Sequence, residues 1–215
     1  IGEAVLELTQ IGKECHSHCE IYKKMGDCIM PREGVFTEVV KGGRIRKGDA
    51  VEMEAPSPDR PYTAAVITLS DKGVKGERED KSGPKICELA EAAGYQIRET
   101  LLLADAIEPL KRQLIRLADQ RQMDVIFTTG GTGFSERDLT PEATIQACDR
   151  MANGIADAIR NYSMTITPRA MFSRAVSGIR GKTLIINLPG SPKAVVEALE
   201  FLLPQLDHGL DILRG

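Results

Sequence analysis

The sequence predicts an α/β protein with a doubly wound, mainly parallel sheet and helices on both faces, preceded by a small, partial β-rich module. Three observations predict this fold class. From residue 62 onwards, short apolar strands alternate with helical segments of about 10–15 residues. Residues 1–53 instead hold short alternating runs broken by glycine. Between them, 54–61 ("EAPSPDRP") has three prolines and no apolar periodicity, which indicates a linker.

The composition is that of an ordinary globular protein and excludes several functional classes. Of the 215 residues, 42% are hydrophobic and 27% are charged, and the net charge is −3. Without excess positive charge, the chain is not predicted to bind nucleic acid or an anionic membrane broadly. No apolar run reaches the roughly 18 residues of a membrane span, and no signal peptide opens the chain. Five unevenly spaced cysteines do not form a disulfide framework, so we expect a cytoplasmic location.

The segment 1–53 is predicted to form β-hairpins. Apolar and polar residues alternate at 4–9, 34–40 and 49–53, in the runs "AVLELT", "GVFTEVV" and "DAVEM". The run "KGGRIRKGD" at 41–49 carries four cations, and we interpret it as a solvated hairpin rather than a polyanion site.

From residue 62 onwards each element has a local signal. A continuous apolar run at 64–70 is typical of a strand buried on both faces. Ser82 followed by Pro84 predicts a helix start, and Gly94 predicts its end. The other expected elements are strands at 95–104, 124–129 and 183–187, the last in a hairpin around Gly178–Gly181, and helices that start at Asp105, Thr140, Ala152 and Ser191.

The loops after residues 70, 104, 129 and 187 are the first places to look for a ligand. Parallel sheets bind ligands beyond the carboxyl ends of their strands, where the strand order reverses. These loops are rich in glycine, which lets a backbone approach a phosphate, and in carboxylates, which suit Mg²⁺ near a phosphate. Neither a dinucleotide-binding fingerprint nor a P-loop is present. The candidate residues are Ser70, Asp71, Lys72, Ser82, Gly83, Asp105, Gly130, Gly131, Thr132, Gly133, Asp138, Pro189, Gly190 and Ser191.

Structural interpretations remain open for several of these residues. Gly130–Gly133 would also suit a tight turn between strand and helix, and Lys72 would suit a solvated surface. Asp105, with Glu108 three residues later, matches a capping box, and Thr140 and Ser191 are each expected to cap a helix. Asp138 is different, because it lies two residues before a cap that does not need it.

Three motifs carry a family resemblance: "VITLSDKG…GEREDKSGP", "FTTGGTGFSERDLTPEAT" and "IINLPGSPKAV". With their spacing they resemble the MogA/MoaB family of molybdenum-cofactor biosynthesis proteins and the adenylyltransferase domains of gephyrin-type proteins, over residues 62–213. The resemblance implies a MogA-like fold for a domain at 62–215. It also implies an enzyme that transfers AMP from ATP to the terminal phosphate of molybdopterin, releases pyrophosphate, requires Mg²⁺ and forms a homotrimer. Other cofactor-assembly proteins are further candidate partners.

The resemblance also implies roles for individual residues. Asp138 and Asp105 would be the catalytic acids and the Mg²⁺ ligands. Gly130–Gly133 and Ser82-Gly83 would hold phosphates, and Pro189, Gly190 and Ser191 would lie beside the nucleotide, with Ser70, Asp71 and Lys72 on the loop after the first strand. The alternative is a non-catalytic domain of the same fold that only binds and carries molybdopterin.

A second resemblance concerns residues 1–53. "GEAVLELTQIGKEC" followed by "GVFTEVVKGGRIRKGDAVEM" resembles the C-terminal part of a MOSC domain, a β-rich module related to molybdenum-cofactor sulfurases. It implies that Cys15 handles sulfur or the cofactor. Two alternatives stay open. One is a zinc site formed from Cys15, His16, His18, Cys19 and Cys28, although the spacing C-x3-C-x8-C with interior histidines is not that of a standard finger or ribbon. The other is that these residues have no role beyond packing.

Overall fold

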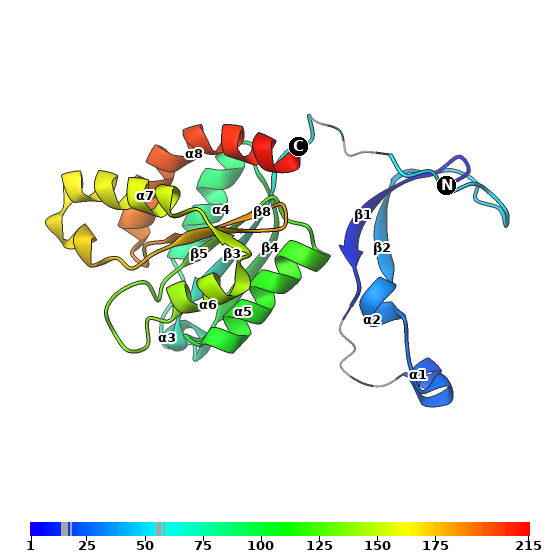
Figure 1. The fold of residues 1–215 in the computed structure, drawn as a ribbon, viewed down its shortest axis with the longest axis horizontal. Helices are drawn as coiled ribbons and strands as arrows, with labels where there is room; N and C mark the ends of the chain where they lie inside the picture. The colour runs from blue at the N-terminus through cyan, green and yellow to red at the C-terminus, as the bar shows by residue number, and fades with distance from the viewer. Residues whose placement is uncertain (14–16, 18, 55–56, 58) are drawn as a thin grey trace. The chain divides into compact units, whose positions relative to one another are not determined.

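The computed structural model describes residues 1–13, 17, 19–54, 57 and 59–215. The chain divides into two compact units (Figure 1). The first comprises Ile1–Arg60 with Asp119–Gln122, and the second Pro61–Ala118 with Met123–Gly215.

The first unit is built around a pair of antiparallel strands, β1 (Val5–Ile11) and β2 (Val35–Lys41). Two short helices, α1 (Glu20–Met25) and α2 (Met30–Glu33), lie between these strands in the sequence. Few of the described side chains here are buried, and Ala4 is the only described hydrophobic side chain of this unit in the core. An isolated pair of strands is only marginally stable in water.

The strand expected at 49–53 and the hairpin expected at 41–49 were wrong. The chain turns at Lys47-Gly48, but residues 49–54 have no regular structure. Arg44 instead returns to the start of the chain, where its carbonyl accepts from the Glu3 N–H at 3.4 Å. Val51 and Met53 are 66% and 84% exposed, so the apolar side chains of the alternating run 49–53 do not form a buried face.

The second unit is a three-layer α/β domain whose six-stranded sheet has the order β4-β3-β5-β8-β7-β6. The first four strands in this order are mutually parallel, and β7 and β6 add an antiparallel edge. This confirms the predicted mainly parallel sheet, while the short edge strand β6 had no sequence signal. The strand bounds are β3 Thr63–Leu69, β4 Gln96–Leu103, β5 Val125–Thr129, β6 Arg150–Met151, β7 Ser177–Arg180 and β8 Thr183–Leu188.

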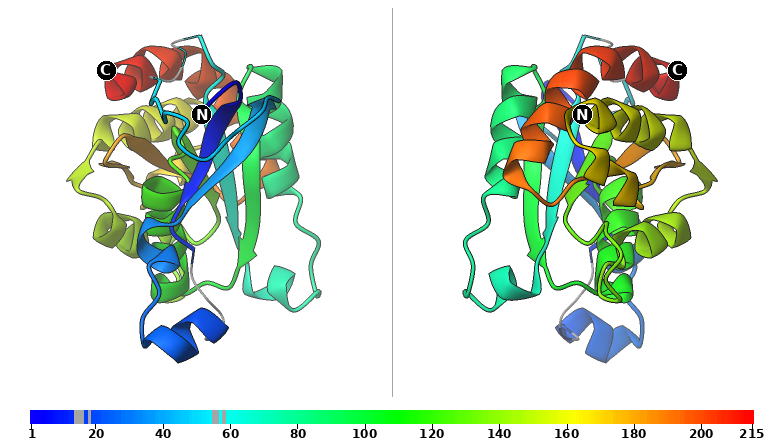
Figure 2. Two further views of the ribbon diagram at one scale, coloured as in Figure 1. Left: turned by 90° about the vertical axis from the view of Figure 1, so that its right-hand side faces the viewer. Right: turned by 90° about the vertical axis from the view of Figure 1, so that its left-hand side faces the viewer.

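Helices cover both faces of this sheet, as predicted (Figure 1). One core joins Val66, Phe127 and Ile186 of the strands to α4, α7 and α8. The other joins their sequence neighbours, such as Ile67 and Ile126, to α5 and α6. Figure 2 shows α8, in red, and α7, in yellow, together on one side. The bounds are α3 Asp71–Val74, α4 Ser82–Ala92, α5 Ile107–Ile115, η1 Arg116–Gln120, α6 Thr140–Ala147, α7 Asn153–Ile166, η2 Pro168–Phe172 and α8 Pro192–Arg214.

The strand order places the loops that matter. The chain runs from β3 to β4 on one side and then crosses to β5 on the other side of β3. The strand order therefore reverses at β3, and the loops after β3 and β5 diverge there, which is where doubly wound sheets bind ligands. Since β3, β4, β5 and β8 are parallel, all four candidate loops lie at one edge of the sheet.

Candidate functional site

Asp71 and Asp105 join the loops that follow β3 and β4. The Asp71 N–H donates to Oδ2 of Asp105 at 3.0 Å, and the Asp105 N–H donates to Oδ1 of Asp71 at 3.1 Å. Arg137, from the loop after β5, forms an ion pair with Oδ2 of Asp71. Three of the candidate loops therefore meet at a pair of carboxylates.

The capping box predicted for Asp105 was wrong. Helix α5 begins after Ala106, whose extended backbone makes Ala106 the N-cap, and no side chain caps the helix. Asp105 is thus one residue too early, and its carboxylate instead binds the loop after β3. Burial raises the pKa of Asp105, and the negative charges of Asp71 and Asp138 act in the same direction, while the Asp71 N–H and the Arg137 guanidinium oppose them.

The Gly130–Gly133 loop passes so close to its neighbours that two of its glycines are required. Gly130 and Gly131 have φ of +96° and +62°, which side chains rarely allow. A Cβ on Gly130 would stand 2.4 Å from the Leu69 carbonyl oxygen. On Gly131 it would stand 2.5 Å from Oγ1 of Thr140 and 3.2 Å from Oδ1 of Asp105. The Asp105 carboxylate therefore lies against the glycine backbone.

Thr140 binds this loop, and the prediction that it caps α6 was wrong. Its Oγ1 donates to the Gly130 carbonyl at 2.9 Å, and its N–H donates to the Gly131 carbonyl at 3.1 Å. Thr140 is already the first residue of α6, so its hydroxyl cannot act as the N-cap acceptor, and the cap residue Leu139 has no side chain for it. Thr140 therefore couples the start of α6 to the glycine loop.

Asp138 lies at the end of residues 134–137, the exposed segment that follows the glycine loop, and bonds back to Ser135. Its Oδ2 accepts from the Ser135 N–H at 2.8 Å, and its own N–H donates to the Ser135 carbonyl at 2.9 Å. A Cβ on Gly133 would stand 2.9 Å from that Oδ2. The carboxylate thus lies beside the glycine loop and within electrostatic reach of Asp105.

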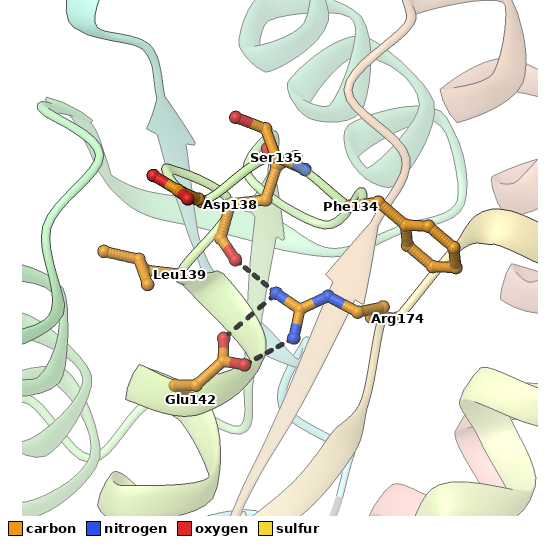
Figure 3. Close-up of a pocket in the computed structure, with 7 residues that line it drawn as sticks. Phe134, Ser135, Asp138, Leu139, Glu142 and Arg174 are labelled. Atoms are coloured by element: carbon orange, nitrogen blue, oxygen red, sulfur yellow. Dashed lines mark hydrogen bonds and ion pairs between the residues drawn. The ribbon is translucent and has the colours of Figure 1, made fainter.

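Beside Asp138 is an open pocket of about 420 Å³ (Figure 3). It is lined by Phe134, Ser135, Glu136, Asp138, Leu139, Glu142 and Arg174. Arg174 binds both carboxylate oxygens of Glu142, and this pairing lowers the pKa of Glu142 and raises that of Arg174. Sequence reasoning missed both residues, because nothing near Arg174 in the chain marks it and its partners lie 32 to 41 positions away.

Ser82 connects the start of α4 to the loop after β8. The cap predicted for Ser82 was wrong, because Ser82 is already the first residue of α4 and the N-cap is Lys81, whose side chain makes no cap. The acceptor comes instead from Asp80, whose Oδ1 accepts from the N–H groups of Ser82 and Gly83, both at 3.0 Å. The Ser82 hydroxyl is therefore available to donate to the Gly190 carbonyl at 3.0 Å. Gly190 in turn approaches Gly130, since a Cβ on it would stand 3.3 Å from the Gly130 Cα.

The remaining candidates lie at the same edge of the sheet with clearer structural roles. Oγ of Ser70 accepts from the Gly73 N–H at 3.0 Å, and Lys72 on α3 is exposed. The Pro189 carbonyl accepts from Thr129 Oγ1 at 2.6 Å. Ser191 caps α8 as predicted, accepting from the Ala194 N–H at 3.4 Å. Thr132 is buried, and its carbonyl accepts from the Arg174 N–H at 2.8 Å.

In the first unit, Cys15 and His16, named for the sulfur and zinc hypotheses, lie outside the described residues, as does His18. Cys19 is exposed, and the backbone N–H groups of Tyr22 and Ile21 lower the pKa of its thiol. Within the part of the chain that the structure describes, no group of three or more His, Cys, Asp and Glu side chains forms a metal-binding cluster.

Among the described residues, no helix has both the length and the apolar character needed to cross a bilayer.

A family model, curated relatives and solved structures all place this chain among molybdopterin-related proteins. A family model described as a probable molybdopterin binding domain matches residues 65–208. The molybdopterin adenylyltransferase of Helicobacter pylori strain 26695 is 40% identical over 152 residues, which cover 70% of this chain and 86% of that protein. The Escherichia coli K12 protein of the same name is 36% identical over 138 residues, covering 63% of this chain and 70% of that protein.

Solved structures agree with the sequence relatives. The molybdopterin biosynthesis enzyme MoaB from Thermus thermophilus superposes with a TM-score of 0.68 at 42% identity, covering 72% of this chain and 97% of that one. The tungsten cofactor synthesizing protein MoaB from Pyrococcus furiosus superposes with a TM-score of 0.64 at 34% identity, covering 75% and 100%. Together with the matched family model, they show that this chain belongs to the molybdopterin-binding domain family of MogA- and MoaB-type proteins.

Proposed function

We propose that this chain is a molybdopterin adenylyltransferase of molybdenum-cofactor biosynthesis, which transfers AMP from ATP to the terminal phosphate of molybdopterin and releases pyrophosphate. The observation that carries the proposal is the meeting of Asp71, Asp105, Asp138 and the Gly130–Gly133 backbone at one sheet edge. It lies in a domain whose curated relatives at 36–40% identity are named for this reaction.

The reaction needs no side-chain nucleophile. A terminal phosphate is largely ionised at pH 7, so its oxygen attacks the α-phosphorus of ATP, and the bond from that phosphorus to the oxygen bridging the β-phosphate breaks. The pair of electrons leaves with pyrophosphate. Repulsion between two anions is the main barrier, and backbone N–H groups of the glycine loop, held by Thr140, are suited to stabilise the developing charge.

We propose that Asp105 and Asp138 hold Mg²⁺ during this reaction. Carboxylate oxygens are the hard ligands that Mg²⁺ prefers, and it usually takes one or two of them together with phosphate oxygens. The described residues fit that pattern, because Asp105 lies against Gly131 and Asp138 against Gly133 on the same glycine loop, and they form no complete cage. When bound, the cation would neutralise phosphate charge. Asp138 is therefore assigned to positioning and metal binding rather than to general base catalysis.

The substitution Asp138→Asn tests the proposal. The amide keeps the size of the side chain and an oxygen that can accept from Ser135, but it removes the charge. We expect Mg²⁺-dependent pyrophosphate release to be lost while molybdopterin still binds. Asp149→Asn is a matched control, since the Asp149 carboxylate also accepts from a backbone N–H, that of Gly181 at 2.8 Å, and does not line the pocket. Near-normal turnover by Asp138→Asn would refute the assignment.

The alternative is a domain that binds and carries molybdopterin without catalysis. Among the described residues, no particular contact favours it over the enzyme. Addition of molybdopterin to the wild-type chain with ATP and Mg²⁺ separates the two. Tight pterin binding without pyrophosphate release would identify the carrier.

We further propose that the chain forms a homotrimer, as its resemblance to the family implies, and that other cofactor-assembly proteins are partners. Exposed apolar side chains near the pocket support an interface, since Phe134, Met171 and Phe172 are 69%, 55% and 52% exposed. The molar mass in solution, measured by light scattering, tests this proposal. A monomer at micromolar concentration would contradict it.

For residues 1–53 we propose the C-terminal part of a MOSC-like domain, joined by a linker at 54–61 to the adenylyltransferase domain at 62–215, with Cys15 as a sulfur- or cofactor-handling thiol. Support comes from the resemblance of the sequence and from the two antiparallel strands β1 and β2. Alkylation of Cys15 should be faster than that of Cys87, whose pKa is raised by burial. Equal and slow labelling of the two would contradict a reactive thiol.

A further inference from the structure

Arg174 contacts both ends of the exposed loop that carries Asp138. This arginine lies between η2 and β7, far from the loop in the sequence. Its Nε donates to the Gly133 carbonyl at 2.7 Å, and its Nη2 donates to the Asp138 carbonyl. Its main-chain N–H donates to the Thr132 carbonyl just before the loop. Figure 3 shows the guanidinium between Asp138 and Glu142.

The loop's own hydrogen bonds do not attach it to the sheet. Ser135 and Asp138 bond to each other through their backbones and the Asp138 carboxylate, and the Arg137 N–H reaches only Oγ of Ser135. Residues 134–137 are exposed. Their described contacts outside the loop are those of exposed side chains, namely Arg137 with Asp71 and Phe134 with Phe172. Among the described contacts, the hydrogen bonds that reach the backbone of residues 133–138 from outside this segment come from Arg174.

Arg174 is itself held from two sides. Glu142 on α6 accepts from both terminal nitrogens of the guanidinium, which fixes its plane. Arg160 on α7 donates to the carbonyls of Ser173 at 2.9 Å and Ala175 at 2.8 Å, on either side of Arg174 in the chain. The arginine is thus a rigid link between two helices and the loop.

We propose that Arg174 is a positioning residue for adenylyl transfer, which fixes the Asp138 carboxylate and the glycine-loop N–H groups relative to each other by holding the Gly133 and Asp138 carbonyls. This inference rests on the function proposed above. Arginine suits the task because its planar fork donates to several acceptors at once, whereas lysine presents a single point charge on a flexible stem.

The first test is the kinetics of Arg174→Lys, which keeps the charge. We expect kcat to fall by at least about 10-fold, because small displacements of positioned groups cost about that much or more. The KM for ATP should change by less than about threefold. The control is Arg116→Lys, since Arg116 also pairs with a glutamate, Glu99 on β4, and does not line the pocket. An equal loss of kcat in both variants would overturn the inference.

The second test repeats Arg174→Lys in an Asp138→Asn background. If Arg174 acts through Asp138, the substitution should add little to the loss already caused by Asp138→Asn. Single-turnover measurements at high enzyme concentration resolve the small rate that Asp138→Asn leaves, and a merely structural role would reduce that rate by the same factor as it reduces the wild-type rate. That multiplicative result would contradict the proposal.

The third test does not depend on activity. Hydrogen exchange of peptides covering 133–139 should be faster in Arg174→Lys than in the wild-type chain, while exchange in α4 stays unchanged. Unchanged exchange at 133–139 would refute the inference even if the enzyme is active. If the wild-type chain transfers no AMP, the proposed function fails, and exchange still decides whether Arg174 holds the loop. Should Arg174→Lys not fold, Glu142→Gln provides the same readout, with a smaller increase expected and no increase refuting it.

Discussion

Replacing Gly131 with alanine separates the cost of an unusual backbone conformation from the cost of crowding the site. Gly131 has φ of +62°, and an added Cβ would stand 2.5 Å from Oγ1 of Thr140 and 3.2 Å from Oδ1 of Asp105. Gly181, in the turn between β7 and β8, has φ of +54° and has no atom within 4 Å of its added Cβ. The two substitutions therefore share the backbone strain and differ in their contacts.

The left-handed conformation costs a non-glycine residue roughly 1–2 kcal/mol, part of which is offset by the reduced freedom of the unfolded chain. We therefore expect Gly181→Ala to lower the free energy of unfolding by about 1 kcal/mol. Gly131→Ala must also displace the Thr140 hydroxyl, which breaks its hydrogen bond to the Gly130 carbonyl and costs about 1 kcal/mol more. A total of about 2 kcal/mol is expected for Gly131→Ala.

Thermal unfolding followed by circular dichroism measures the difference. For a chain of this size, 1 kcal/mol corresponds to a Tm shift of roughly 2–4 °C, so Gly131→Ala should melt that much below Gly181→Ala. Pyrophosphate release should fall by at least about 10-fold in Gly131→Ala, because the Asp105 carboxylate and the loop are displaced. Gly181→Ala should retain full activity. Equal Tm values and equal rates for the two variants would refute the reasoning.

Two further predictions use the perturbed titrations. The hydrogen bond from Arg174 lowers the pKa of Glu142, so the ionised Glu142 stabilises the fold above its ordinary pKa of 4.5, and this contribution is lost as the pH falls through the lowered pKa. The Tm difference between the wild-type chain and Glu142→Gln should therefore shrink between pH 7 and pH 3. A constant difference would contradict this prediction. Burial raises the pKa of Cys148 to about 11, whereas the exposed Cys19 has a lowered pKa. Iodoacetamide at pH 7.5 should therefore label Cys19 much faster than Cys148, which peptide mass spectrometry would measure. Faster labelling of Cys148 would contradict this difference in pKa.

The sequence predicted most of the fold because the second unit follows simple periodicities. The continuous apolar runs of β3, β5 and β8 can be satisfied only by burial on both faces, and the helices between them require parallel crossovers. Parallel crossovers bring the loops after these strands to one edge, so Asp138 and Gly130–Gly133 were identified as candidates without coordinates. In the first unit the alternation at 49–53 predicted a strand that does not form, because a two-residue alternation does not show whether a strand has a partner strand or a core to pack against.

From the amino-acid sequence alone came the candidate residues, namely the glycines and carboxylates of four loops, and the expectation that these loops lie at one edge of the sheet. Only the tertiary structure decided their partners. Asp105, Thr140 and Ser82 each look like helix caps, yet each binds another loop, because a helix that starts one residue earlier or later changes what its first side chain can reach. Arg174 had no local signal, since its partners are brought to it by the packing of α6 and the β5 loop. Hydrogen bonds between residues this far apart in the sequence depend on how the helices pack on the sheet, and short sequence patterns do not predict that packing.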